Sequence, residues 1–180
     1  HQAHQTLKDL ALTDSLTGLG NRRRLDAVLD VEIARARRQG YPVALVMMDL
    51  DFFKAYNDRY GHLAGDQCLR RVGEVLGQAL KRPADLAVRY GGEEFTLLLP
   101  DTDGHGAGLI VQETLQQLRR LAIEHAGSPF GVVSASAGIA VAHPAQQPIS
   151  AQALVAEADA ALYEAKRQGR DRYCMAQAQG

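Results

Sequence analysis

The sequence predicts an α+β fold in which a central, mainly antiparallel sheet is covered by helices in a two- or three-layer sandwich. Short apolar runs alternate along the chain with longer segments in which apolar residues recur at helical spacing. Two of the short runs flank a double glycine, which is a hairpin signal. After an opening helix, the predicted order of elements is β-α-α-β-β-α-β-α-β. Strands that alternate with helices around one hairpin are typical of split βαβ folds.

The first half of the chain supplies the opening helix and one crossover. Residues 21–39 carry apolar side chains at helical spacing with arginines between them, and Gly40 is placed to end this helix. Residues 41–51, YPVALVMMDLD, form an apolar run too short for a helix and therefore predict a buried strand. A short helix over 52–60 and a longer one over 63–81 follow, with a glycine between them.

The second half contains the hairpin and closes the sheet. It predicts strands over 86–90 and 95–99, a helix over 104–126, a strand over 132–141, a helix from Ser150 to Gly169 and a short strand over 172–175. The chain has 180 residues, 46 % of them hydrophobic, which is enough for one buried core. We therefore expect one domain over residues 13–180, preceded by a lead-in segment.

Charge and cysteine content narrow the class of protein. Lys and Arg number 20 against 21 for Asp and Glu, so net charge favours neither a nucleic-acid nor a membrane partner. The two cysteines, Cys68 and Cys174, lack metal-ligand spacing and suit a reducing compartment. The sequence also shows no membrane-span or signal-peptide pattern, which predicts a cytoplasmic location. Residues 1–12 read as the end of a signalling helix, so we expect the output domain of a multidomain or membrane-anchored protein.

The hairpin carries paired carboxylates. Gly91 and Gly92 predict a two-residue turn, because glycine tolerates the positive φ that such turns need. Glu93 and Glu94 would then occupy consecutive strand positions and point to opposite faces of the sheet. Only one of them could face a given site. The alternative interpretation is a solvated hairpin tip, since charged residues near turns are common.

A second acidic pair at a strand end favours a site. Asp49 and Asp51 end the buried strand, and Lys54 follows them. Ligands of open α/β sheets bind at the carboxyl ends of strands. If Asp49 meets a hairpin glutamate, their repulsion requires a cation between them, and oxygen ligands suit Mg²⁺ or Mn²⁺. Such an ion would hold a phosphate chain, which predicts nucleotide chemistry.

Five sequence blocks resemble the GGDEF family of diguanylate cyclases. They are DSLTGLGNRR from Asp14, DLDFFKAYNDRYGHLAGD from Asp49, RYGGEEF from Arg89, SAGIA from Ser136 and ADAALYEAKRQGR from Ala158. The blocks follow the family's order and span nearly the whole chain. The resemblance implies a ferredoxin-like βαββαβ palm core of the nucleotide-cyclase type. It also implies condensation of two GTP molecules into cyclic di-GMP with release of two pyrophosphates.

The resemblance implies a role for each matching residue. Two divalent ions per GTP would be held by Asp49, the carbonyl of Leu50 and Glu93, with Glu94 assisting. The two glutamates are also candidate proton acceptors. Guanine would be recognised by Asn57 and Asp66, with His62 near the ribose or base. The remaining substrate contacts would come from Phe52, Phe53, Lys54, Gly91, Gly92, Lys166 and Arg170, and Lys54 would also assist catalysis. An Asp carboxylate accepts from guanine N1–H and N2–H₂, a pair of donors that adenine lacks.

Each of these residues also has an interpretation without a ligand. Asn57 and Asp66 could cap helices. Asp51 could support the metal ligands from behind or cap a helix, and we expect the cap. Lys166 and Arg170 could form a solvated basic helix end, His62 could belong to a turn, and Lys54 could lie over Phe52 and Phe53.

Regulation and assembly follow from the same resemblance. One domain binds one GTP, so catalysis is expected to need a homodimer of domains with C2 symmetry, arranged by an upstream sensory domain. Arg82 and Asp85 are similar to the family's RxxD inhibitory site, where the product cyclic di-GMP would bind. The alternative there is a polar loop between helix and strand, with Pro83 stopping the helix. For the whole chain the rivals are an inactive binding module for GTP or cyclic di-GMP and another nucleotidyl transferase.

Overall fold

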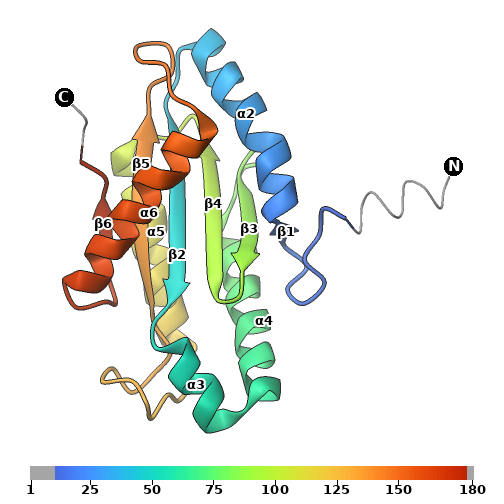
Figure 1. The fold of residues 1–180 in the computed structure, drawn as a ribbon, viewed down its shortest axis with the longest axis vertical. Helices are drawn as coiled ribbons and strands as arrows, with labels where there is room; N and C mark the ends of the chain where they lie inside the picture. The colour runs from blue at the N-terminus through green and yellow to red at the C-terminus, as the bar shows by residue number, and fades with distance from the viewer. Residues whose placement is uncertain (1–10, 178–180) are drawn as a thin grey trace, which may run out of the picture.

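The computed structural model describes residues 11–177 and shows one sheet with helices on both faces (Figure 1). The described strands are β1 (Gly20–Asn21), β2 (Val43–Leu50), β3 (Leu86–Gly91), β4 (Glu94–Pro100), β5 (Ala135–Ala142) and β6 (Tyr173–Met175). The helices are α2 (Arg22–Gln39), α3 (Phe53–Tyr60), α4 (His62–Ala79), α5 (Gly104–Arg120) and α6 (Ala151–Arg167).

The sheet has the order β1-β3-β4-β2-β5-β6. Strand β2 is central and runs antiparallel to both neighbours, β4 and β5, and β3 runs antiparallel to β4. The inner order β3-β4-β2-β5, with a helical crossover before β3 and another before β5, is that of the ferredoxin-like split βαβ fold. The predicted fold class and palm core are confirmed.

The pleat of β2 sorts its side chains between two layers of helices. Ala44, Val46 and Met48 belong to a core cluster shared with α3, α4 and α5. The intervening Val43, Leu45 and Met47 belong to a second cluster shared with α2 and α6. Because side chains alternate with period 2, the next odd residue, Asp49, faces the α6 layer. The alternation thus decides which helix supplies partners to Asp49.

Helix α6 lies very close to the sheet over β5. A Cβ on Gly138 would fall 2.1 Å from the backbone N of Leu162, so only glycine permits this approach. The small residues Ala158 and Ala161 on α6 are buried at the same interface. This close packing places the last turn of α6, which carries Lys166, beside the end of β2.

The hairpin turn differs from its prediction by one residue. Gly91 still belongs to β3 and pairs with Glu94, so the turn residues are Gly92 and Glu93. Of these two turn residues only Gly92 has a positive φ, 50°, which matches a type II′ turn with glycine first. The cause is an irregularity between Arg89 and Gly91 that inserts one residue into β3. Glu93 therefore lies in the turn, and the prediction that both glutamates occupy strand positions is wrong.

Other element boundaries move by a few residues. Strand β1 was not predicted, α5 stops at Arg120, and β5 begins only at Ala135. The chain between α5 and β5 instead forms a loop closed by a bridge between Glu124 and Val132. All but two residues of the predicted lead-in helix fall outside the described part of the chain. Among residues 11–177, no helix combines the length and the apolar character that a membrane crossing needs.

Candidate active site

Two carboxylates meet across the sheet where β2 ends. Asp49 on β2 and Glu94 on β4 are directly paired neighbours in the antiparallel ladder, so they share the face covered by α6. Asp49 is 6 % exposed, and its Oδ2 accepts a hydrogen bond from Lys166 Nζ. Its other oxygen, Oδ1, is buried and has no hydrogen-bond partner. A buried acceptor without a donor is costly, which marks this oxygen as a ligand position.

Burial, together with the neighbouring carboxylates, raises the pKa of both acids. Burial raises the pKa of Asp49, and the charge of Glu93 adds to the rise, whereas Lys166 opposes it. Burial also raises the pKa of Glu94, with contributions from the carboxylates of Asp49 and Asp159. A cation placed beside these carboxylates would favour their ionised forms and lower the pKa of both acids.

The donor set at this strand end fits a hard divalent cation. It consists of carboxylate and carbonyl oxygens, and Asp49 Oδ1 is free to accept. Within residues 11–177 no group of three or more His, Cys, Asp or Glu side chains is arranged as a metal site by itself. Mg²⁺ is commonly held by one or two carboxylates with the phosphates of a substrate completing its shell, so a closed protein cage is not required.

Asp51 ties three segments together instead of capping a helix. It is 3 % exposed, and its two oxygens accept from the hydroxyls of Ser136 at 2.6 Å and Ser134 at 2.7 Å. The backbone N–H of Asp171 donates to it at 3.1 Å. The N-cap of α3 is Phe52, which makes no side-chain capping bond, so the predicted capping role of Asp51 is wrong. Asp51 joins β2 to β5 and to the turn that follows α6.

That turn brings Arg170 onto the ring of Phe52. The guanidinium carbon of Arg170 lies 4.7 Å from the ring centroid, a cation–π distance. Both residues have left-handed backbones, with φ of 67° and 56°. By contrast, the side chain of Phe53 is buried in the core and stacks on Tyr56 at 5.8 Å. Lys54 is exposed in the first turn of α3. Arg170, whose charge acts on Asp49, therefore lies against Phe52 at the start of the helix that carries Lys54.

Asn57, His62 and Asp66 line the junction of α3 and α4. Gly61 serves both as C-cap of α3 and as N-cap of α4, with no side-chain capping bond, so the capping alternative for Asn57 and Asp66 is wrong. Asn57 Oδ1 is buried without a partner and lies where a Cβ on Gly65 would be 1.8 Å away. His62 is exposed, and Asp66 lies four residues later on the same face of α4.

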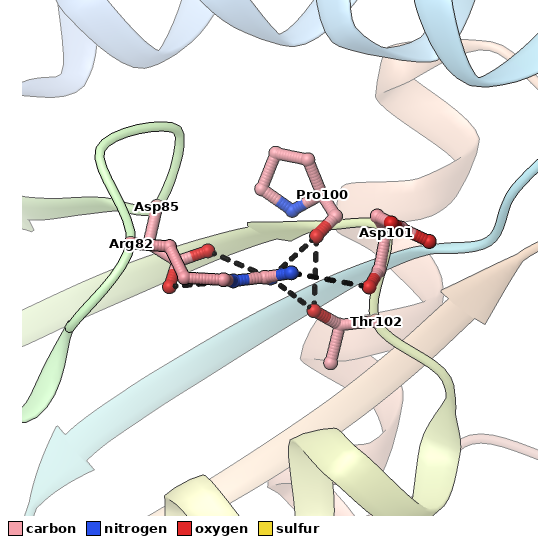
Figure 2. A network of polar contacts seen from close by, with 5 residues as sticks. All are labelled: Arg82, Asp85, Pro100, Asp101 and Thr102. Atoms are coloured by element: carbon pink, nitrogen blue, oxygen red, sulfur yellow. Dashed lines mark hydrogen bonds and ion pairs between the residues drawn. The ribbon is translucent and has the colours of Figure 1, made fainter. Parts of the chain in front are cut away.

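Arg82 and Asp85 form an ion pair at the opposite end of the sheet (Figure 2). Arg82 donates to Asp85 Oδ1 at 2.9 Å and Oδ2 at 3.4 Å. The same guanidinium donates to the Pro100 carbonyl and the Thr102 hydroxyl, both at 2.5 Å, and to the Asp101 carbonyl at 3.3 Å. Pro100 pairs with Val43, the first residue of β2. The two predicted inhibitory residues are thus brought together, far from Asp49.

Sequence reasoning missed three residues around the site. Asp159 lies on α6 seven residues before Lys166, and burial raises its pKa. Its helical spacing from Lys166 was the available signal. Asp14 pairs with Arg89 at 3.2 Å and so anchors the chain before β1 to the hairpin. His125, in the loop after α5, hydrogen-bonds the carbonyl of Phe52, and no pattern in the sequence indicates that contact.

Comparison with known proteins gives a consistent result. Residues 11–172 match the family model described as diguanylate cyclase, GGDEF domain. The chain is 38 % identical over 172 residues to the diguanylate cyclase DgcP of Pseudomonas aeruginosa, covering 96 % of this chain and 25 % of that protein. It is also 38 % identical over 169 residues to the response regulator PleD of Caulobacter vibrioides, covering 91 % of this chain and 36 % of the other.

A solved structure agrees in fold. The coiled coil and GGDEF domain of DgcB from Caulobacter crescentus, in complex with c-di-GMP, matches with a TM-score of 0.87 and 32 % identity, covering 97 % of this chain and 91 % of that one. The chain spans only about a quarter to a third of the length of the two curated relatives, at 25 % and 36 %. The chain belongs to the GGDEF-domain family of diguanylate cyclases.

Proposed function

We propose that this domain condenses two molecules of GTP into cyclic di-GMP and releases two pyrophosphates. The observation that carries the proposal is the pairing of Asp49 with Glu94 across β2 and β4, with Asp49 Oδ1 buried and without a partner. These acids lie in the two sequence blocks that most resemble the family's catalytic motifs. Family membership supports this activity over that of an unrelated nucleotidyl transferase.

Asp49, the Leu50 carbonyl, Glu93 and Glu94 would hold two Mg²⁺ or Mn²⁺ ions. Such ions lower the pKa of a bound hydroxyl and stabilise the charge of a leaving phosphate. Within the protein, Glu93 or Glu94 accepts the proton of the attacking ribose 3′-hydroxyl. The position of Glu94, directly opposite Asp49 in the ladder, supports this role. Lys166, which contacts Asp49, orients that carboxylate and adds positive charge for the phosphates.

Recognition of guanine is assigned to the junction of α3 and α4. Asn57 and Asp66 would bind the edge of the base, and His62 the ribose or base. The buried, unpartnered Oδ1 of Asn57 supports this assignment, because a base donor would satisfy it. The phosphates would contact Lys54, Lys166 and Arg170, together with the chain at Phe52, Phe53, Gly91 and Gly92.

The reaction needs two such domains, because each GTP supplies its 3′-hydroxyl to the other. We propose a homodimer with C2 symmetry, arranged by a sensory domain elsewhere in the protein. The small share of each relative that the chain spans supports the presence of further domains in this class of protein. Both cysteines are free thiols, which supports a cytoplasmic location.

The activity is tested by incubating the chain with GTP and Mg²⁺ and separating the products by chromatography. We expect cyclic di-GMP and pyrophosphate in a ratio of one to two, and no product from ATP. Asp49→Asn serves as the matched control that keeps the shape of the side chain. Binding of GTP without turnover, at domain concentrations that support dimers, would establish the inactive binding module instead.

We also propose that Arg82 and Asp85 bind cyclic di-GMP and lower turnover. Their ion pair is 43 % exposed on the arginine side, so a ligand can reach the guanidinium. Arg82→Ala should abolish inhibition by added product while leaving initial rates in place. Unchanged product inhibition in that variant would reject the assignment.

A further inference from the structure

The loop between α5 and β5 forms hydrogen bonds to both ends of α3. His125 is 1 % exposed, and its Nε2 lies 2.9 Å from the carbonyl oxygen of Phe52, the residue that precedes α3. The next residue, Ala126, donates its N–H to the hydroxyl of Tyr60, the last residue of α3, at 2.9 Å. The ring of Phe130 lies 6.4 Å from that of Phe52. The loop therefore contacts both ends of α3, the helix whose first turn carries Lys54.

The contact fixes the tautomer of His125. A carbonyl oxygen only accepts, so Nε2 carries the proton and donates it to Phe52. The other ring nitrogen, Nδ1, is buried and has no hydrogen-bond partner. The ring meets Tyr56 edge-on, with 5.2 Å between centroids and 87° between planes. The ring of His125 is thus held in one orientation by packing, and its one hydrogen bond within the described residues is to Phe52.

Phe52 is an unusual residue to hold in this way. Its φ of 56° and ψ of 34° are left-handed, a conformation that a bulky side chain adopts only when its surroundings impose it. Its carbonyl also accepts from the N–H of Tyr56 at 3.0 Å, so His125 and the first helical bond together occupy both lone pairs. Its ring carries the guanidinium of Arg170.

We propose that His125 is a positioning residue for Lys54 and Arg170, which would contact the phosphates of GTP. By holding the Phe52 carbonyl, His125 fixes the left-handed backbone at that residue. That backbone sets the direction of the first turn of α3, which carries Lys54, and the position of the ring on which Arg170 lies. This role rests on the proposed function, since it concerns the GTP that the site would bind. The α5–β5 loop lies outside the sequence blocks that resemble the family. Under this proposal the loop nevertheless contributes to substrate binding.

The test compares three variants of His125 in the 180-residue chain. His125→Gln places an amide donor near the position of Nε2, His125→Asn places it one bond short, and His125→Phe keeps a ring without a donor. We expect the Kd of a nonhydrolysable GTP analogue and the KM for GTP to rise about tenfold in the Phe and Asn variants, as for a lost buried hydrogen bond. The Gln variant should stay within about threefold of wild type, and kcat should change less than KM in all three.

Tyr60→Phe is the matched control, because it removes the acceptor for Ala126 on the same loop without touching the Phe52 carbonyl. It should lower Tm by less than the His125 variants, because the bond that it removes is exposed, while leaving KM at the wild-type value. If His125→Phe and His125→Asn lower Tm but leave KM and Kd unchanged, the residue is merely structural and the proposal fails. Should His125→Phe not fold, the contrast between Gln and Asn decides. If wild type itself neither binds nor converts GTP, the proposed function fails, a result distinct from equal binding by wild type and variant.

Discussion

The carboxylates near the two ends of β2 differ in how well their oxygens are satisfied. Asp49, near the carboxyl end, has one oxygen on Lys166 and one buried oxygen without a partner. Asp85 lies near the other end, about 20 Å away along the strand at ~3.4 Å per residue. Both of its oxygens accept from Arg82, which also donates to main-chain carbonyls (Figure 2). The carboxylate of Asp49 can still accept a ligand, whereas both oxygens of Asp85 are already satisfied by Arg82.

This difference teaches how to separate two acidic sites that look alike in sequence. An unsatisfied buried oxygen has an energetic reason to bind a cation or donor, and a satisfied one does not. Any ligand at Arg82 must instead compete with contacts that the protein already makes. We therefore expect substitutions near Asp49 to change function more than stability, and substitutions near Asp85 to change stability as well.

The largest expected effect is on activity. Asp49→Asn should lower the rate of cyclic di-GMP formation by at least about 10²-fold, the range seen when one charge-stabilising group is removed from a site. The measurement is product formation at saturating GTP and Mg²⁺, with Tm recorded in parallel. A variant that keeps more than a tenth of the wild-type rate would remove Asp49 from the catalytic centre.

The same substitution should stabilise the fold at neutral pH. The folded-state pKa of Asp49 lies above the ordinary value of 3.8, so the folded chain binds more protons between the two values. The unfolding free energy of wild type therefore falls as pH rises through that window. Asp49→Asn does not show this fall, because the asparagine amide does not titrate. Urea unfolding at several pH values should show equal stability for variant and wild type below the ordinary pKa and a more stable variant above the raised one. Equal stability at every pH would contradict the raised pKa.

Ligand binding should sharpen the contrast between the two ends. A nonhydrolysable GTP analogue with Mg²⁺ at 100 times its Kd should stabilise wild type by about 2.7 kcal/mol. Arg82→Ala should show the same gain, whereas Asp49→Asn should show little. Differential scanning calorimetry with and without the analogue measures both. An equal gain in all three proteins would place nucleotide binding away from Asp49.

Removing Arg82 should cost stability by itself. Arg82→Ala leaves the Asp85 carboxylate, whose side chain is 3 % exposed, without its donor, and also removes the bonds from Arg82 to the Pro100 carbonyl and the Thr102 hydroxyl. We expect a loss of about 1–3 kcal/mol in unfolding free energy. Arg70→Ala, at an exposed position of α4, is the control and should stay within about 0.5 kcal/mol. Equal losses would mean that the network contributes nothing specific.

The fold was predictable because its main signals are local. The apolar run of β2 and the helical spacing in α4 and α6 are visible within single segments, and the order of elements then leaves few topologies. The acids of the site were found for a related reason, since Asp49 ends a strand and Glu94 follows a hairpin. Their partnership depends only on β2 and β4 being neighbours.

Contacts made across the sheet were not predictable in this way. Asp51 accepts from Ser134 and Ser136, which lie 83 and 85 residues away, so its local position suggested a helix cap. His125 lies 73 residues from Phe52, in a loop that the helical pattern of 104–126 concealed. Such pairings are set by how two loops meet at one end of the sheet, and no periodicity in either segment encodes them.

The smallest effect tests the hairpin that sets Glu94 opposite Asp49. Of the two hairpin glycines, only Gly92 has a positive φ. Gly92→Ala should therefore lower unfolding free energy by about 1 kcal/mol, or Tm by roughly 2–4 °C, through the steric cost of a left-handed alanine. Gly91→Ala has open space around its Cβ and an ordinary strand position, so it should be neutral. Thermal unfolding of both variants decides between the two turns. A larger loss for Gly91→Ala would restore the turn at Gly91 and Gly92 that the sequence indicated, and with it the placement of Glu93 in the strand.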